Sequence, residues 1–249
     1  MAAKPLSSVW KLTKASLATW NQHAKILTLV VALVAVPTNL LQLLLSAGDT
    51  TLSAYVSLAA LVMNLALIWA IIRLESGDKK VSLCQAYYEG TASLVRFLLV
   101  SFLLVAELVP LAIGLLLYNV GVAGAAPGTT GFEEIIISLL ALALAVPSLF
   151  WFNRSLLALV LLPGSELRPM TAVKQSWRSV RGRSWQVLRK LLGLVLVAGL
   201  LIAVPAIILV LLYEHTTNRG FLALLQLFAS LAILPLIDIY LYKLSQELA

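Results

Sequence analysis

The chain has 249 residues, of which 61% are hydrophobic and 12% charged, and its formal net charge is +7. An average soluble domain is about 45–50% apolar and about 25% charged, so this composition excludes an ordinary soluble domain and a disordered chain. A nucleic-acid-binding protein is excluded as well, and the basic charge is expected to face anionic lipid. One cysteine, Cys84, permits no intrachain disulfide, and with two histidines the chain offers no structural zinc site. We expect a polytopic membrane protein without metal or cofactor.

Six stretches are long enough to cross a bilayer, which takes about 20 mostly apolar residues. Several contain a proline, which membrane helices accommodate as a kink. The sequence therefore predicts an all-α fold, with one integral membrane domain over residues 1–249. The predicted spans are 26–45, 52–72, 94–118, 135–162, 191–213 and 221–242.

Basic residues are distributed unevenly among the segments between the spans. Every Lys and Arg except Arg219 lies before the first span, between spans two and three, from within span four to the start of span five, or after span six. Lys and Arg accumulate on the cytoplasmic side of membrane proteins. This asymmetry predicts a multi-pass protein of the plasma membrane with both termini in the cytoplasm.

A polar, helix-compatible stretch precedes each odd-numbered span, and the spans align on Pro37, Pro110 and Pro205. Each stretch has Ser or Thr near its start, which favours a helix N-cap, and Ser82 with Gln85 fits a capping box. The predicted unit is one cytoplasmic helix followed by a transmembrane hairpin, used three times. The predicted parts are an interfacial helix at 1–25, spans at 26–72, a helix with spans at 82–162, and a basic helix with spans at 171–242.

The first and third polar stretches are amphipathic, with tryptophan on one side and cations beside it. This pattern is typical of an interfacial helix. Either these helices cap the bundle and enforce topology, or they bind a lipid headgroup. The expected interfacial anchors are Trp10, Trp20, Trp177 and Trp185, and the cations expected to face anionic lipid are Lys174, Arg178, Arg181, Arg183, Arg189 and Lys190.

Ionisable residues inside the predicted spans are candidates for function, because charge is costly in a membrane. Glu107 follows Arg96 by eleven residues, about 16 Å of helix, which places it near the midplane. Arg154, with Asn153 beside it, and Asp238 lie nearer the cytoplasmic side. Three interpretations stay open: a structural pair of Arg154 with one of the carboxylates, a polar site for a headgroup or a proton, and snorkelling to the interface, above all by Asp238.

The segment from Arg154 to Trp185 resembles a known membrane family. After Arg154 it contains Ala172 followed by Ser176-Trp177, and then Arg181-Gly182 followed by Trp185. These elements resemble the membrane domain found ahead of some bacterial glycerophosphoryl diester phosphodiesterases, and related stand-alone six-helix membrane proteins. The resemblance implies a six-helix fold in a bacterial plasma membrane. Phosphodiesterase activity is not carried over, since its barrel would need about 250 further residues.

Catalytic patterns are scarce in this sequence. It contains no His-Glu-x-x-His, no Gly-x-Ser-x-Gly and no phosphate-loop pattern. We therefore expect a non-enzymatic integral membrane protein that organises lipid or partner proteins through a basic cytoplasmic face. Its expected partners are anionic lipid headgroups, with a protein partner or a homo-oligomer left open. The alternatives are a permease-like transporter or exporter subunit with a polar site near Glu107 and Arg154 and, less favoured, a lipid-acting enzyme.

Overall fold

The computed structural model describes residues 7–44, 50–78, 81–123, 131–163, 167–212 and 219–248. Within these ranges the regular elements are all helical, which confirms the predicted all-α class. Six helices are long and apolar enough to cross a membrane, as predicted. The predicted ends at residues 45 and 213 lie outside the described residues. The candidate spans are Val9–Gln42, Ala54–Glu75, Leu94–Gly121, Phe132–Leu161, Ser184–Ile207 and Ala223–Leu248.

The first unit consists of α1 (Val9–Leu44) and α2 (Thr50–Glu75). Helix α1 combines the predicted interfacial helix and the first span without an intervening loop. The two parts meet at a kink, where His23 leaves helical geometry with φ −114° and ψ 15°. The predicted boundary after residue 25 therefore falls close to this kink, which separates two helical segments.

The second unit consists of α3 (Leu83–Thr91), α4 (Leu94–Tyr118), the π-helix η1 (Asn119–Ala123) and α5 (Gly131–Ser155). The hydroxyl of Ser82 accepts the N–H of Gln85 at 3.2 Å, which confirms the predicted N-cap of α3. The Tyr87 hydroxyl of α3 donates to the Val30 carbonyl of α1 at 2.6 Å. Burial raises the pKa of Tyr87 to about 12, so the hydroxyl stays protonated and able to donate at physiological pH.

The third unit follows a short helix, α6 (Ala158–Leu161), and begins with α7 (Pro169–Val180). The spanning helices after it are α8 (Ser184–Leu212) and α9 (Arg219–Phe228), the latter continued by η2 (Ala229–Ile233) and α10 (Leu234–Leu248). The prediction of one continuous basic helix is wrong. A turn separates α7 from α8, and Gly182 within it has φ +81°, a left-handed conformation that glycine adopts without strain.

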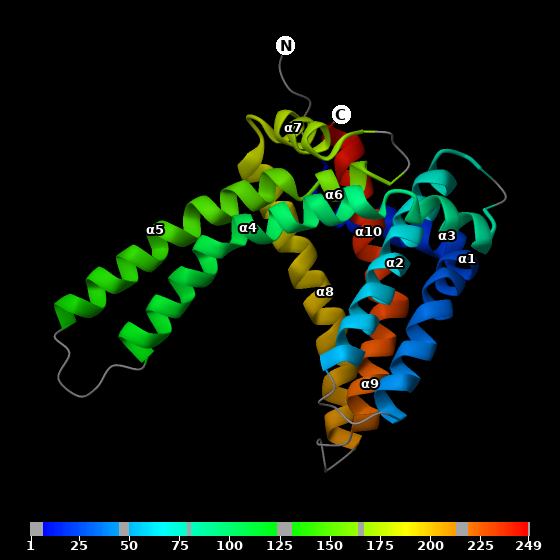
Figure 1. The fold of residues 1–249 in the computed structure, drawn as a ribbon, viewed down its shortest axis with the longest axis horizontal. Helices are drawn as coiled ribbons and strands as arrows, with labels where there is room; N and C mark the ends of the chain where they lie inside the picture. The colour runs from blue at the N-terminus through cyan, green and yellow to red at the C-terminus, as the bar shows by residue number, and fades with distance from the viewer. Residues whose placement is uncertain are drawn as a thin grey trace.

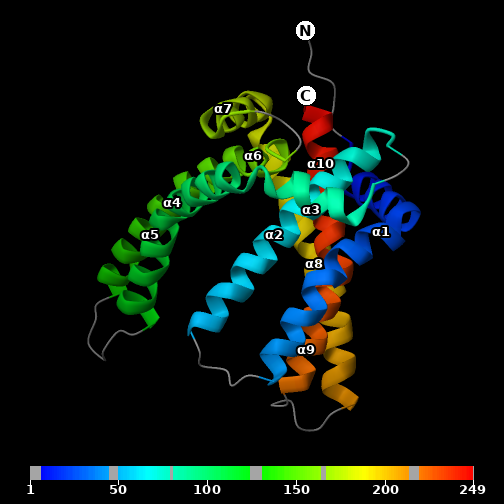
Figure 2. The ribbon, with the colours of Figure 1, turned by 45° about the vertical axis from the view of Figure 1, so that its right-hand side comes forward.

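The start of α1 and the end of α10 lie at the same end of the molecule as α3, α6 and α7, and we call this the terminal end (Figure 1). Helices α1, α2, α8, α9 and α10 form a bundle. The hairpin of α4 and α5 leans away from it, and among the described residues it meets the other helices near the terminal end (Figures 1 and 2). The largest core cluster lies between α1, α2, α3 and α10, and it includes the fully buried Leu27, Val30, Leu67, Ile71 and Ile239.

Candidate functional site

A chain of polar contacts joins the α4–α5 hairpin to α7, where the hairpin meets the bundle. The indole N–H of Trp177 donates to the Ser155 hydroxyl at 2.8 Å. That hydroxyl donates to Oε1 of Glu107 at 2.6 Å, and the Ser148 hydroxyl donates to the Glu107 backbone carbonyl. We call these four residues, together with Arg154, the hairpin-root network. It holds α4, α5 and α7 in one arrangement.

The Glu107 carboxylate is only half satisfied within this network. Its Oε1 accepts from Ser155, whereas Oε2 is buried and has no hydrogen-bond partner among the described residues. Leaving a buried acceptor unpaired costs about 1–3 kcal/mol, so a proton or a hydrogen-bond donor at Oε2 would stabilise this carboxylate. Glu107 is therefore the residue of the network best placed to take a proton or a donor from a ligand.

Arg154 contacts aromatic rings instead of a carboxylate. Its guanidinium carbon lies 4.1 Å from the ring centre of Phe150 and 5.9 Å from that of Trp177, a cation–π arrangement. Its Nε donates to the Ser184 hydroxyl at 3.4 Å, and its backbone carbonyl accepts from the Ser176 hydroxyl. The predicted structural pair of Arg154 with a carboxylate is wrong, since no such pair forms between described residues.

Asn153 and Asp238 are buried at different places in the fold. Asn153 is 2% exposed, and its Nδ2 donates to the Ser184 carbonyl at 2.9 Å, which extends the hairpin root to α8. Asp238 lies in α10, is 5% exposed, and its Oδ2 has no partner among the described residues. The expectation that Asp238 snorkels to the interface is therefore wrong, and it does not join the hairpin-root network.

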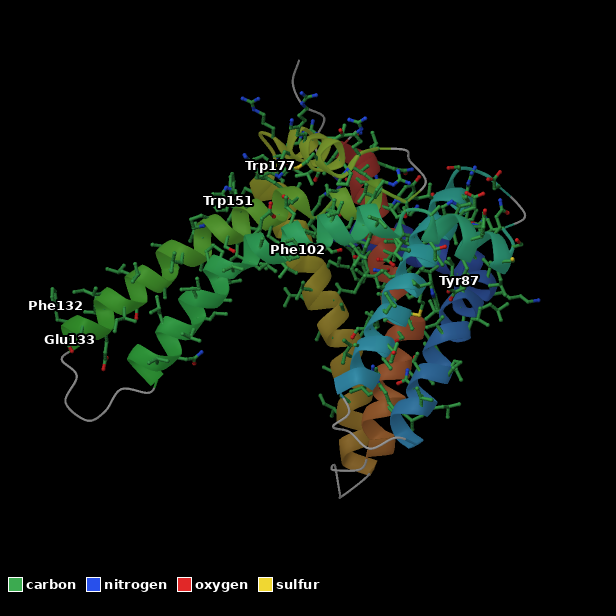
Figure 3. The ribbon with its side chains drawn as sticks, viewed as in Figure 1. Tyr87, Phe102, Phe132, Glu133, Trp151 and Trp177 are labelled. Carbon is green, nitrogen blue, oxygen red and sulfur yellow. The ribbon has the colours of Figure 1, made fainter. Side chains whose placement is uncertain are left out.

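The exposed cations of α7 and α8 form a basic surface at the terminal end, where Figure 3 shows nitrogen-tipped side chains around Trp177. None of them has an ion-pair partner within the described ranges. The opposite face of α7 is buried against α4, α5, α6 and α10, so the helix is fixed with its cations outward. The exposed members are Lys174, Arg178, Arg181 and Arg189, and Arg183 beside them is half-buried.

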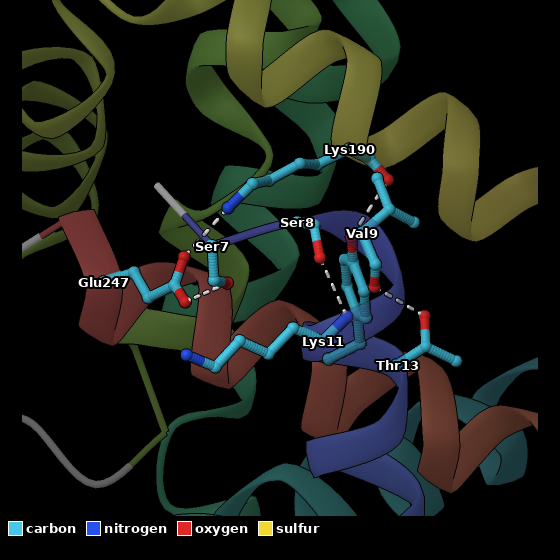
Figure 4. A network of polar contacts seen from close by, with 8 residues as sticks. Ser7, Ser8, Val9, Lys11, Thr13, Lys190 and Glu247 are labelled. Atoms are coloured by element: carbon cyan, nitrogen blue, oxygen red, sulfur yellow. Dashed lines mark hydrogen bonds and ion pairs between the residues drawn. The ribbon is translucent and has the colours of Figure 1, made fainter. Parts of the chain in front are cut away.

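Lys190 does not belong to this surface, and the prediction that it faces lipid is wrong. Its side chain is buried, and Nζ lies 2.8 Å from Oε2 of Glu247 (Figure 4). The other oxygen of Glu247 accepts from the Ser7 hydroxyl, and the Tyr240 hydroxyl donates to the Lys190 carbonyl at 3.2 Å. This cluster joins the start of α1, α8 and the end of α10. Helical spacing from the buried Val187 and Leu194 was the signal that could have placed Lys190 inside.

The four predicted tryptophan anchors divide into two kinds. Trp10 and Trp185 are 73% and 68% exposed, which suits an interfacial position. Trp177 is 37% exposed but is tied to the hairpin-root network, and Trp20 packs against the core cluster of α1, α2 and α10. Two of the four tryptophans, Trp20 and Trp177, therefore contact other parts of the protein, and Trp10 and Trp185 remain available at the surface.

A substitution at Glu107 separates the structural and chemical contributions of its carboxylate. Glu107→Gln keeps an oxygen that accepts from Ser155, so thermal stability in detergent is expected to change by less than about 0.5 kcal/mol. Glu107→Leu removes that acceptor and is expected to cost about 1–3 kcal/mol. Equal melting temperatures for the two variants would contradict a hydrogen-bonded network at the hairpin root.

Among the described residues, the arrangement offers binding chemistry and no recognisable catalytic set. The Ser155 hydroxyl is held between an indole and a carboxylate, and no described histidine or lysine hydrogen-bonds to it. No group of three or more His, Cys, Asp and Glu in the described part of the chain could hold a metal ion. No protein-family model, curated protein or solved structure matches this chain.

Proposed function

We propose that this protein is a non-enzymatic integral membrane protein that binds anionic phospholipid headgroups through its basic surface, on the cytoplasmic side of a bacterial plasma membrane. The observation that carries the proposal is the set of exposed cations on α7 and at the start of α8, without ion-pair partners in the described ranges.

The physical support is electrostatic. Each Lys or Arg near an anionic membrane surface contributes about 1 kcal/mol of attraction. This attraction decays with distance over about one Debye length, and it becomes weaker as the salt concentration rises. The cations are presented by a helix whose other face is fixed in the fold, so little conformational freedom is lost on binding. Trp185, which is mostly exposed, adds apolar contact beside the charges.

The test is lipid preference of the purified full chain. Removing the exposed cations together, in Lys174→Gln, Arg178→Gln, Arg181→Gln and Arg189→Gln, is expected to lower the enrichment of phosphatidylglycerol over phosphatidylcholine at least tenfold. Lipids retained from mixed micelles would be counted by native mass spectrometry at low and high salt. The matched control exchanges the same residues for the other basic type, Lys for Arg and Arg for Lys, and should keep the preference. An unchanged preference in the glutamine variant would refute the proposal.

A second function, a permease-like transporter or exporter subunit, draws support from the hairpin-root network. The Oε2 of Glu107, without a partner among the described residues, belongs to the network that joins the α4–α5 hairpin to α7. Charged residues in such positions line substrate or proton paths in transporters. Co-purification from native membranes with protein identification distinguishes the two, because a recovered ATPase would favour the exporter subunit.

A further inference from the structure

A cavity of about 410 Å³ lies between α4 and the first turn of α7, apart from the basic surface. A volume of this size falls within the range of small-molecule sites, about 300–1,000 Å³. Its walls are apolar except for one residue, Arg168. The lining residues are Leu99, Val100 and Leu103 of α4, and Arg168, Pro169, Met170 and Val173 at the start of α7.

The described part of the rim carries positive charge. Arg168 is exposed and occupies the N-cap position of α7, with no ion-pair partner among the described residues. The first turn of α7 contains no acidic residue and receives no side-chain cap, so within the described part of the chain no side chain compensates the positive end of the helix dipole. Nη1 of Arg96 donates to the Leu167 carbonyl at 3.4 Å, which brings a second guanidinium beside the same helix end.

A cation at a helix N-terminus is electrostatically unfavourable unless an anion lies near it. The arrangement therefore favours a ligand with a negative group at the rim and an apolar chain in the cavity. The first turns of α4 belong to a candidate span, so the apolar walls face the region that acyl chains occupy in a membrane. Phospholipid combines both chemistries in one molecule.

We propose that this cavity binds one anionic phospholipid, with its phosphate at Arg168 and the N-terminus of α7 and one acyl chain along Leu99 and Leu103. This proposal rests on the proposed function, because the lipid comes from the same leaflet that the basic surface faces. It differs in assigning a site for one lipid molecule instead of a diffuse surface. The walls include Val100 and Val173, which also belong to the core cluster of α4, α6 and α7. An occupied site would therefore brace the hairpin against α7.

The test titrates the purified full chain with phosphatidylglycerol, phosphatidylcholine or inorganic phosphate and counts bound molecules by native mass spectrometry. We expect one tightly held phosphatidylglycerol, whose affinity falls at least tenfold in Arg168→Gln and in Leu99→Trp, which fills the cavity from an exposed position. Lys14→Gln removes one exposed charge of α1, outside both the cavity lining and the basic surface, and is the matched control, expected to leave this molecule bound.

A second measurement does not depend on any variant. A phosphatidylglycerol with a photoreactive group in its acyl chain should label peptides containing residues 99–103 and 168–173 of the unmodified chain. Equal binding of phosphatidylcholine, competition by inorganic phosphate alone, or labelling elsewhere would overturn the site. The proposed function is tested by a different result. The variant lacking the basic surface should lose bulk enrichment of phosphatidylglycerol while retaining this one molecule.

Discussion

Gly90→Ala is expected to destabilise the protein by about 1–3 kcal/mol, the cost of overpacking a buried site. Gly90 is buried where α3 lies on α2. A Cβ atom there would lie 2.8 Å from the Cα of Ala66, and 3.0 Å from both the Ala66 nitrogen and the Leu65 carbonyl oxygen. These are backbone atoms of a packed helix, so no side-chain rotation relieves the clash. Thermal unfolding in detergent, followed by circular dichroism, measures the loss.

Gly199→Ala is the matched control for this substitution. Gly199 lies in α8 and its added methyl group would meet no atom within 4 Å. Because alanine is a better helix former than glycine, the control should be neutral or stabilise by up to about 1 kcal/mol. If both glycine substitutions gave the same melting temperature, α3 would not approach the α2 backbone as closely as the structure has it.

Glu247→Gln is expected to cost about 1–3 kcal/mol, because it leaves the buried ammonium of Lys190 without its charged partner. The carboxylate accepts from Lys190 and from Ser7, so the loss loosens the start of α1, α8 and the end of α10 together (Figure 4). Glu247 is partly open to solvent, which keeps the cost below that of a fully buried pair. Chemical or thermal unfolding in detergent provides the measurement.

A double-mutant cycle identifies the cause of that loss. Combining Glu247→Gln with Lys190→Met removes the buried charge along with its partner, and stability is expected to return most of the way to that of the parent. Lys11→Gln, an exposed lysine close to the same cluster, should have little effect. Strict additivity of the Lys190 and Glu247 substitutions would show that the two side chains do not interact.

The spans were predictable because a bilayer demands long apolar runs, and such runs are visible without any alignment. The order of a short helix before each pair of spans was also visible, as the Ser82 cap shows. The break between α7 and α8 at Gly182 was not visible in the sequence, because a single glycine within a helical pattern is compatible with either a continuous helix or a turn. The φ of +81° at Gly182 shows that a turn forms there. The leaning hairpin escaped prediction because lipid-facing and protein-facing helix surfaces are equally apolar.

The candidate site was predicted in its residues but not in its contacts. Glu107 and Arg154 were singled out as charges within a span, and both lie at the hairpin root. Opposite charges suggested a pair, yet Arg154 contacts aromatic rings, whereas Glu107 accepts from a serine hydroxyl at one oxygen only. Their partners come from α5, α7 and α8. Contacts between residues so far apart in the chain produce no periodic sequence pattern from which they could be predicted.

The kink at His23 has a mechanical consequence. No loop separates the amphipathic segment from the first span, and the non-helical backbone of His23 is the joint between them. Trp10 and Lys11 are exposed on the amphipathic segment, whereas the spanning segment packs into the bundle core. A bilayer that thins or curves changes the tilt a span prefers. A change in the tilt of the first span would therefore either alter the angle at His23 or move the exposed Trp10 and Lys11 along with the span.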